Sequence, residues 1–502
     1  MMQYQTFIGL EVHIHLLTKT KAFCSCKAAF GDEPNSNVCP VCMGYPGVLP
    51  ALNGEAMRMA GIVAKALNCT LSPKTWFERK QYFYPDMAKN YQISQFASPV
   101  GVEGWVDIPS ASSPGGKKRI RIKEAHLEED AGKMIHAGNV SLIDYNRAGT
   151  SLLEIVTEPD FETGAEAEAY LHQLRRTVRY LGVCDGNMEE GSMRCDANVS
   201  INTPGAGLGR KVEIKNLNSS RFVRLGLDYE IKRQAELLDK GGTIRQETRL
   251  WNENRDQTEI MRSKESSHDY RFFPEPDLPV FEPDAEFIAS VEAGLVELPF
   301  DRERRLAVEY SLSAEQAALA CDERAGADWF EEAVKDAVRL GVDKTAAAER
   351  VANWMSTEVR RVMNRDGLEL AGIGSFRVTS ARMATIVAMV AAGRVSNKVA
   401  RQVFEAVLEE DAEPAAIVAA RGWELVVDPV KIAAAVDKAF SDEASTVADA
   451  VAALTQGNEG RIRSLSAFLA GKAITASGGK AEPSLVRTAV DVRLKTLAAA
   501  AV

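Results

Sequence analysis

The stretch Ile8–Leu16, with the sequence IGLEVHIHL, alternates strictly between apolar residues and others. Residues two apart share one face of a β-strand, so the apolar set would form a packed face. The opposite face carries Glu11, His13 and His15. A carboxylate and two imidazoles in one row are costly to place on a sheet unless a cleft or a metal ion meets them. This stretch therefore predicts a strand with one core face and one functional face.

Two later segments repeat this alternation. The segment RCDANVSI, residues 194–201, places Asp196 between apolar residues, and the segment KVEIK, residues 211–215, does the same with Glu213. If all three strands belong to one sheet, the polar face of that sheet gathers Glu11, His13, Asp196 and Glu213.

The size and charge of the chain limit the possible classes of protein. A chain of 502 residues is too long for one hydrophobic core and predicts two or three domains. The net charge of −10 argues against a basic signature for nucleic-acid binding over the whole chain, but leaves room for a local patch. There is no apolar run of 18 residues and no secretory leader, so we expect a cytoplasmic protein whose eight cysteines are reduced.

Four cysteines lie close together in two tight pairs, Cys24 with Cys26 and Cys39 with Cys42. Four thiolates at this spacing are typical of a tetrahedral zinc site without an open position, which is structural rather than catalytic. The alternative is a set of four unrelated buried thiols, which this pairing disfavours.

Aromatic, amide and charged side chains mix in the segment 80–95, KQYFYPDMAKNYQISQ. Lys80, Tyr82, Tyr84 and Tyr91 could stack on a base or line a polar pocket. A packed loop whose rings belong to the core is an equally good interpretation of this segment.

Further acidic residues follow in HLEED, residues 126–130, and in SLLEIV, residues 151–156. The first run is more typical of a solvated turn. Glu154 lies within an otherwise apolar strand and must be paired or bind a cation, and several carboxylates together suit Mg²⁺. The sequence contains neither a Walker A motif nor a kinase glycine-rich loop, so no standard motif locates an ATP site. It contains no evident amidase triad either.

The second half of the chain has a different composition. A proline-rich stretch at residues 266–280 predicts the end of the first domain, and from about Pro283 the sequence is alanine-rich with helical periodicity. Residues 461–495 contain seven basic residues and two acidic ones. A solvated helical face explains this charge better than a tail that contacts phosphates, although both remain open.

Long motifs together identify a family. The chain closely resembles the B-subunit family (GatB) of the bacterial tRNA-dependent amidotransferase GatCAB. The resemblance extends over nearly the whole chain and is carried by GLEVHIHL, FCSCKAAF, CPVCMGYPGVLPALN, RKQYFYPDMAKNYQISQF, HLEEDAGK, DYNRAGTSLLEIVTEPD, MEEGSMRCDANVSI, VEIKNLNS, HDYRFFPEPDLP and AFLAGKAITASGGKAEPSLV. His15 departs from the family pattern, which more often has glutamine or another polar residue there.

The resemblance implies an α+β architecture. A mainly antiparallel β-sheet cradle with covering helices would occupy residues 1–292, an all-α helical domain residues 293–408, and an all-α YqeY-like tail that binds tRNA residues 409–502. It also implies an ATP-dependent ligase that converts Glu-tRNA(Gln) or Asp-tRNA(Asn) to Gln-tRNA(Gln) or Asn-tRNA(Asn). The implied partners are a glutamine-hydrolysing amidase subunit (GatA), a small third subunit (GatC) and tRNA, with no membrane involved.

The resemblance further implies specific site residues. The catalytic residues and Mg²⁺ ligands would be Glu11, His13, Glu129, Glu154, Asp196 and Glu213, and the structural Zn²⁺ ligands Cys24, Cys26, Cys39 and Cys42. The segment of mixed aromatic and charged residues would bind substrate through Lys80, Tyr82, Tyr84 and Tyr91. Two other functions stay open on sequence alone: a metal-dependent hydrolase that acts by itself, and a non-catalytic RNA-binding protein.

Overall fold

The computed structural model describes residues 4–110, 116–263, 270–426 and 428–500. The chain forms two compact units, residues 1–301 and 302–502. Part of the predicted domain end at 266–280 falls on residues 266–269, which lie outside the described residues.

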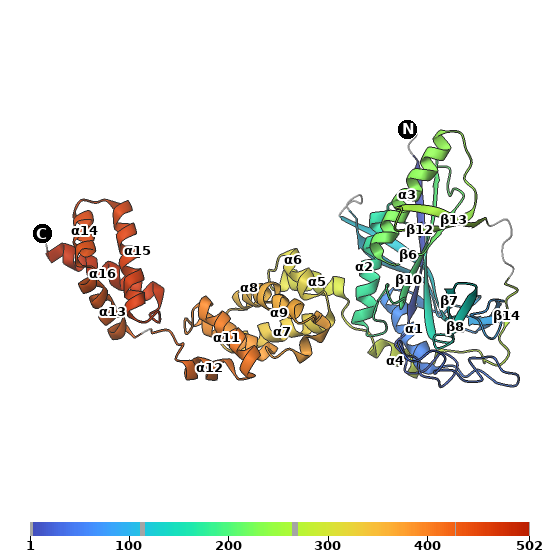
Figure 1. Cartoon of the computed structure of the whole chain (residues 1–502), viewed down its shortest axis with the longest axis horizontal. Coiled ribbons are helices and arrows are strands. Elements are labelled where there is room, and N and C mark those ends of the chain that lie inside the picture. Colours follow the sequence, from blue (N-terminus) through green and yellow to red (C-terminus); the bar gives the residue numbers. More distant parts are fainter. Residues whose placement is uncertain (1–3, 111–115, 264–269, 427, 501–502) are drawn as a thin grey trace. The chain divides into compact units, whose positions relative to one another are not determined.

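The first unit is built on a large sheet (Figure 1). Its strand order is β13-β12-β11-β10-β1-β9-β6-β4-β3-β14, and β5 pairs with β2 and β6 beside this path. All pairs are antiparallel except β11 with β12. The strands of the sheet are β1 (Gln5–His15), β2 (Thr70–Leu71), β3 (Glu78–Gln81), β4 (Tyr91–Ser94), β5 (Gly101–Pro109), β6 (Lys117–Glu129), β9 (Ser151–Thr157), β10 (Met193–Asn202), β11 (Val212–Lys215), β12 (Glu247–Asn252), β13 (Gln257–Ser263) and β14 (Phe273–Pro274). A separate hairpin consists of β7 (Lys133–Ala137) and β8 (Val140–Asp144).

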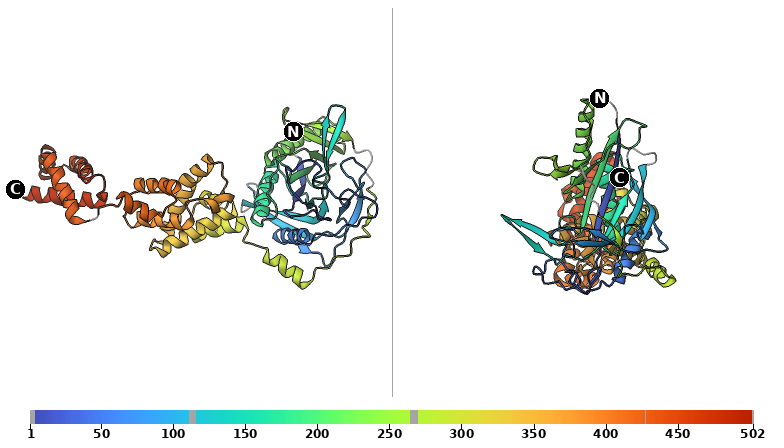
Figure 2. Two further views of the ribbon diagram at one scale, coloured as in Figure 1. Left: turned by 60° about the horizontal axis from the view of Figure 1, so that its bottom comes forward. Right: turned by 90° about the vertical axis from the view of Figure 1, so that its right-hand side faces the viewer.

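Helices α1 (Gly54–Ala66), α2 (Gly164–Tyr180) and α3 (Ser220–Asp239) pack on the apolar face of the sheet. The even-numbered residues of β1 from Ile8 to Ile14 are at most 1% exposed and join these helices in one core. Figure 2 shows that the sheet is curved. Each of the three helices begins at a side chain that accepts backbone N–H groups, namely Asn53, Thr163 and Ser219. The predicted two-faced strand and its covering helices are confirmed.

A β-bulge interrupts β6 between Ile122 and Glu124, opposite β9. Before the bulge Ile120 and Ile122 are buried in the core, and after it Ala125 and Leu127 are. One extra residue therefore moves the even-numbered side chains from the core face to the polar face.

The second unit is all-α and contains two hydrophobic cores. The first core runs from Leu306 to Val418 and the second from Ile432 to Leu494. The helices are α5 (Pro299–Glu309), which begins in the first unit, then α6 (Ala314–Ala320), α7 (Arg324–Arg339), α8 (Lys344–Trp354), α9 (Arg360–Arg365), α10 (Ser380–Ala391), α11 (Asn397–Glu410), α12 (Pro414–Arg421), α13 (Pro429–Asp442), α14 (Ala444–Thr455), α15 (Glu459–Ala476) and α16 (Pro483–Ala500). A short π-helix (Met355–Val359) joins α8 to α9, and a 3₁₀ helix (Leu370–Ser375) follows α9.

The domain limits differ in detail from those predicted. Helix α4 (Ala285–Ala293) packs on α1 so closely that a Cβ added at Gly61 would lie 2.8 Å from Val291 Cγ2. The first unit therefore includes α4 and extends beyond the predicted limit at residue 292. The second predicted limit, at residue 408, falls inside α11, and the two helical cores separate between Val418 and Ile432 instead. No helix among the described residues is long and apolar enough to span a membrane.

Candidate active site

The polar face of β1 lies between polar residues of its two neighbouring strands. Glu11 is opposite Asp196 on β10, and His13 is opposite Glu154 on β9. Glu154 is also opposite His126 on β6. Residues that are paired across a sheet point to the same side, so strand register alone brings these side chains together.

Two groups of potential metal ligands result. The His13 group consists of His13, Glu128 and Glu154, and the Glu11 group of Glu11, Asp196 and Glu213. Within each group the ligand atoms lie within 4.8 Å of one another. His13 Nε2 is 3.3 Å from Glu154 Oε2, and His126 Nε2 is 3.1 Å from the same oxygen. Three protein ligands leave coordination positions open for water and phosphate oxygens, as Mg²⁺ sites usually do.

Burial and neighbouring charge act against each other in the His13 group. Burial by itself would lower the pKa of His13, but Glu154 and Glu128 outweigh it and raise that pKa to about 8. Burial likewise opposes ionisation of Glu154, but His13 and His126 hold its pKa well below the ordinary value. The group is thus a set of buried charges that compensate one another.

The Glu11 group has an excess of negative charge. Burial, followed by the Glu154 and Asp196 carboxylates, raises the pKa of Glu11. Asn198 Nδ2 donates to Glu11 at 2.9 Å, and Lys215 Nζ lies 2.5 Å from Asp196 Oδ2 and 3.3 Å from Glu213 Oε1. Burial opposes the charge of Lys215, but these two carboxylates raise its pKa above the ordinary value. Crowded carboxylates of this kind favour a cation, and the residues fit Mg²⁺.

Another buried carboxylate, Asp130, anchors the end of β1. His15 Nε2 and Arg194 Nη2 each lie 2.7 Å from Asp130 Oδ2, and Arg147 Nε lies at 3.3 Å. Burial opposes ionisation of Asp130, but Arg194, His15 and Arg147 hold its pKa well below the ordinary value. This network fixes the position of His15 next to the His13 group.

The structure brings together five of the six predicted Mg²⁺ ligands but not Glu129. Glu129 forms a buried ion pair with Lys89 and accepts the Ile93 N–H at 2.9 Å. Glu128 takes the predicted place in the His13 group. The bulge in β6 is the physical reason: continuing the alternation of Ile120 and Ile122 would put Glu129 on the polar face, and the extra residue puts Glu128 there.

The four residues predicted to bind substrate lie near the β3–β4 edge of the sheet. Lys80 Nζ is 5.1 Å from the Tyr270 ring centre, and Arg79 lies over the Tyr91 ring. The Tyr82 and Tyr84 rings are 5.7 Å apart. None of the four lines either cavity described below. Their role as substrate ligands stays a prediction.

The four cysteines predicted to bind zinc do lie together, with all four sulfurs within 4.8 Å of one another. Cys39 Sγ and Cys42 Sγ are 3.9 Å apart, close to the separation expected of two ligands on one tetrahedral Zn²⁺. A hydrogen bond with Cys24 lowers the pKa of Cys42 to about 4. The donor set therefore fits Zn²⁺.

Besides Glu128, three residues at these sites were not predicted from the sequence. Lys21 is fully buried, and its Nζ lies 3.7 Å from Cys42 Sγ and 2.7 Å from the Asn37 carbonyl oxygen. Lys215 pairs with Asp196 and His126 pairs with Glu154, so both compensate carboxylate charge on the polar face. The only signal for Lys215 was its alternation with Glu213, and that for Lys21 was its position three residues before Cys24.

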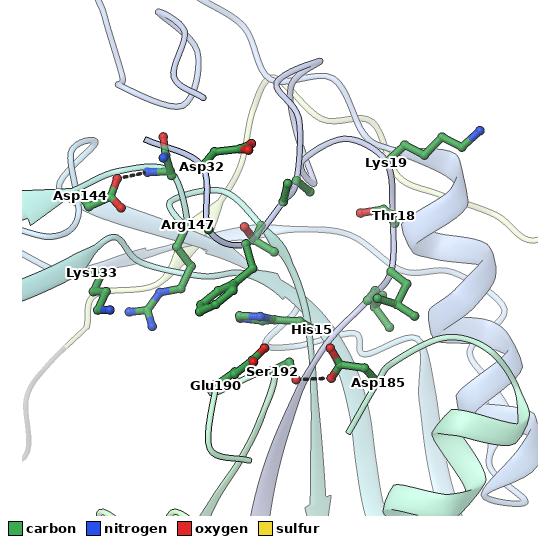
Figure 3. A pocket seen from close by; sticks show the side chains of 18 residues that line it. His15, Thr18, Lys19, Asp32, Lys133, Asp144, Arg147, Asp185, Glu190 and Ser192 are labelled. Atoms are coloured by element: carbon green, nitrogen blue, oxygen red, sulfur yellow. Dashed lines mark hydrogen bonds between the residues drawn. The ribbon is translucent and has the colours of Figure 1, made fainter. Parts of the chain in front are cut away.

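Two cavities lie at opposite ends of the polar face of β1. The larger one has a volume of about 630 Å³ and borders His15, Leu17, Phe30, Glu190 and Ser192 (Figure 3). The smaller one has a volume of about 350 Å³ and extends from Glu11 past Gly9 to Phe7, with Lys123 and Lys211 in its lining.

A sheet face with two groups of potential metal ligands and a cavity at each end makes the first unit a candidate catalytic domain. A family model described as the GatB/GatE catalytic domain matches residues 6–289, and one described as the GatB domain matches residues 328–494. Three similar proteins are named as B-subunits of aspartyl/glutamyl-tRNA(Asn/Gln) amidotransferase. The relative from Brevibacillus brevis is 42% identical over 99% of this chain and 100% of its own length, and that from Thermodesulfovibrio yellowstonii is 42% identical over 98% of this chain and 100% of its own length. The relative from Halorhodospira halophila is 43% identical over 98% of this chain and 99% of its own length. The chain belongs to the GatB family.

Proposed function

We propose that this chain is the subunit of a glutamine-dependent tRNA amidotransferase that activates the side-chain carboxylate of a misacylated tRNA. The substrates would be Glu-tRNA(Gln), Asp-tRNA(Asn) or both, in keeping with the names of the relatives. The observation that carries the proposal is the row on β1 that joins a cavity, the Glu11 group, the His13 group and a second cavity.

The reaction needs an activated carboxylate because a free carboxylate is a poor electrophile. The substrate carboxylate oxygen attacks the γ-phosphorus of ATP and ADP leaves. Ammonia then attacks the acyl phosphate, phosphate leaves and the amide forms. Phosphoryl transfer depends mainly on positioning and on compensation of charge, for which a face of fixed carboxylates and imidazoles is suited.

The chain's own residues have distinct roles in this proposal. His13, Glu128 and Glu154 would hold one Mg²⁺, and Glu11, Asp196 and Glu213 a second. When bound, Mg²⁺ would neutralise negative charge on the phosphate oxygens of ATP. Lys123 and Lys211, in the smaller cavity next to Glu11, would contact the nucleotide. His126 and Lys215 balance the charge of the ligands.

The cysteine cluster, the partner subunits and the tail would contribute to the reaction without contacting the reacting carboxylate. Cys24, Cys26, Cys39 and Cys42 would hold a structural Zn²⁺. Ammonia would come from glutamine hydrolysed by a separate amidase subunit (GatA), with a small subunit (GatC) completing the complex. The tail helices α13–α16, residues 429–500, would contact tRNA. Three of their basic residues pair with acids, and the pairs are Arg461–Asp449, Lys472–Glu443 and Arg493–Asp437, whereas Arg463, Lys480, Arg487 and Lys495 form no ion pair among the described residues.

The proposal is tested by amidation assays on both misacylated tRNAs. With ATP, the assembled complex should form the amide from glutamine or from ammonium, and the isolated chain should use glutamine poorly. Robust glutamine-dependent turnover by the isolated chain, or amide formation without ATP, would contradict this division of labour.

A further inference from the structure

Four alternate residues of β1 mark a path along the polar face. Gly9 lines the smaller cavity, Glu11 and His13 belong to the two ligand groups, and His15 lines the larger cavity. The smaller cavity also borders Glu11, and the four residues of strand from Glu11 to His15 span about 13 Å, so the two cavities are separated along β1. The proposed site of phosphoryl transfer lies between them.

The chemistry requires two substrates to approach from opposite sides. In phosphoryl transfer the attacking and leaving oxygens lie roughly in line through the transferred phosphorus. The carboxylate that attacks and the nucleotide that leaves therefore occupy opposite ends of the path. With ATP proposed at the Gly9 end, the acceptor belongs at the His15 end.

The larger cavity has the size and lining for this acceptor. Its volume of about 630 Å³ suits a nucleoside together with an attached amino acid, whereas the smaller cavity, of about 350 Å³, suits a nucleoside alone. Leu17 and Phe30 border the larger cavity and are 52% and 76% exposed, which leaves apolar surface for a base to contact. Lys19 and Lys133 border the same cavity and are exposed, so their ammonium groups are available to a phosphodiester.

The acidic residues of the larger cavity differ in what they bind. Asp32 pairs with Lys27 at 2.7 Å, Asp144 accepts the N–H groups of Asn35 and Asn146, and Asp185 is bound by Ser192. Glu190, by contrast, is exposed and forms no ion pair with any residue that the structure describes. In Figure 3, Glu190 is drawn close to His15, which Asp130 holds at 2.7 Å.

We infer that the larger cavity receives the aminoacylated 3′-terminal nucleoside of the tRNA, and that the Glu190 carboxylate binds the α-ammonium of the attached amino acid. This inference rests on the proposed function and identifies where its acceptor lies. An aminoacyl ester has a free ammonium group close to the carboxylate that reacts. Binding of the α-ammonium by the Glu190 carboxylate would orient the side chain of the amino acid toward the His13 group. It would also favour an amino acid with a free α-ammonium over one that is N-acetylated.

The test uses the assembled complex with ATP and ammonium, so that glutamine hydrolysis does not affect the result. Glu190→Gln is compared with Glu189→Gln, which removes the same charge from an exposed neighbour outside the cavity lining. Each enzyme is assayed with misacylated tRNA and with the same tRNA N-acetylated on its amino acid. Phe30→Ala and Phe30→Trp test the apolar wall.

We expect Glu190→Gln to raise the KM for misacylated tRNA about tenfold, as loss of a charge-assisted contact does, and to leave the KM for ATP unchanged. N-acetylation should lower kcat/KM about tenfold with the unmodified complex and with Glu189→Gln, but have little effect on Glu190→Gln. Phe30→Ala should also raise the KM for tRNA, and Phe30→Trp should retain it.

Other results would overturn the inference. A rise in the KM for ATP as large as that for tRNA would mean that the nucleotide occupies this cavity. An equal response of Glu190→Gln and Glu189→Gln to N-acetylation would remove Glu190 from the site. In either case, amidation by the unmodified complex would leave the proposed function standing, whereas its failure to amidate would overturn that function itself.

Discussion

The four-cysteine cluster and the polar face of β1 are both sets of potential metal ligands, but they are assembled differently. The cluster comes from one loop, between Cys24 and Cys42. The polar face draws on five strands and on residues from Glu11 to Glu213. Local ligands can build a site as the loop closes on the metal, whereas the polar face exists only when the whole sheet has its correct register. We therefore expect the cluster to control stability and the face to control chemistry.

The largest effect should come from the polar face. His13→Ala, Glu154→Ala and Asp196→Ala should each lower the rate of amidation at least about a hundredfold, because misplaced reacting groups are costly. The fold should survive, since the buried residues Val12 and Ile155 lie on the opposite side of the sheet. The measurements are amide formation with glutamine and with ammonium, together with assembly of the complex by size-exclusion chromatography.

A matched control for these variants is His172→Ala, which removes an exposed imidazole from α2 that contacts Ser220. It should amidate normally. Rescue of His13→Ala by excess ammonium would mean that the face serves delivery of ammonia rather than activation of the carboxylate.

The cysteine cluster should give the second largest effect, and of a different kind. Cys42→Ser should lower the zinc content from one ion per chain and destabilise the first unit, because a structural zinc site contributes free energy to folding. Elemental analysis and thermal unfolding measure both quantities. At a temperature where the variant is folded, its KM for ATP should be close to that of the unmodified chain. Full zinc content or an unchanged unfolding temperature would contradict the structural role.

The smallest effect is the dependence of stability on pH, which should come from the polar face of β1. The pKa of His13 is raised to about 8 in the folded chain, above the ordinary value of 6.5. Its contribution to stability is therefore fully present below pH 6.5 and is lost as pH rises through 8, an effect of about 2 kcal/mol. The pKa of His126 is also raised, so it acts in the same direction.

This pH effect is measured by urea unfolding of the first unit between pH 6 and pH 9, without added Mg²⁺ so that His13 is free to titrate and without chelator so that the cysteine cluster keeps its zinc. The His13→Gln variant should lose most of the pH dependence. A free energy of unfolding that rises between pH 6.5 and pH 8 would contradict this, because it would mean that the folded chain favours neutral His13 over protonated His13.

The same contrast explains how much of the molecule was predictable from the sequence. The strict alternation of Ile8–Leu16 predicted β1 with its two faces, and the tight spacing of the cysteines predicted their cluster, because both signals are local. The identity of Glu128 was hidden by the bulge in β6, which changes the alternation by one residue. The buried Lys21 was equally hidden, since its partners Asn37, Cys42 and Tyr145 depend on how distant loops meet.

The central claim is that the polar face of β1 activates the substrate's side-chain carboxylate by phosphorylation. The most direct measurement uses misacylated tRNA in which both oxygens of the side-chain carboxylate are ¹⁸O, followed by mass analysis of the inorganic phosphate released during amidation. If the account is correct, each phosphate formed with the unmodified complex carries one ¹⁸O, and His13→Ala releases no labelled phosphate. Amide formation with unlabelled phosphate would contradict it, because the carboxylate oxygen would then never have been bonded to phosphorus.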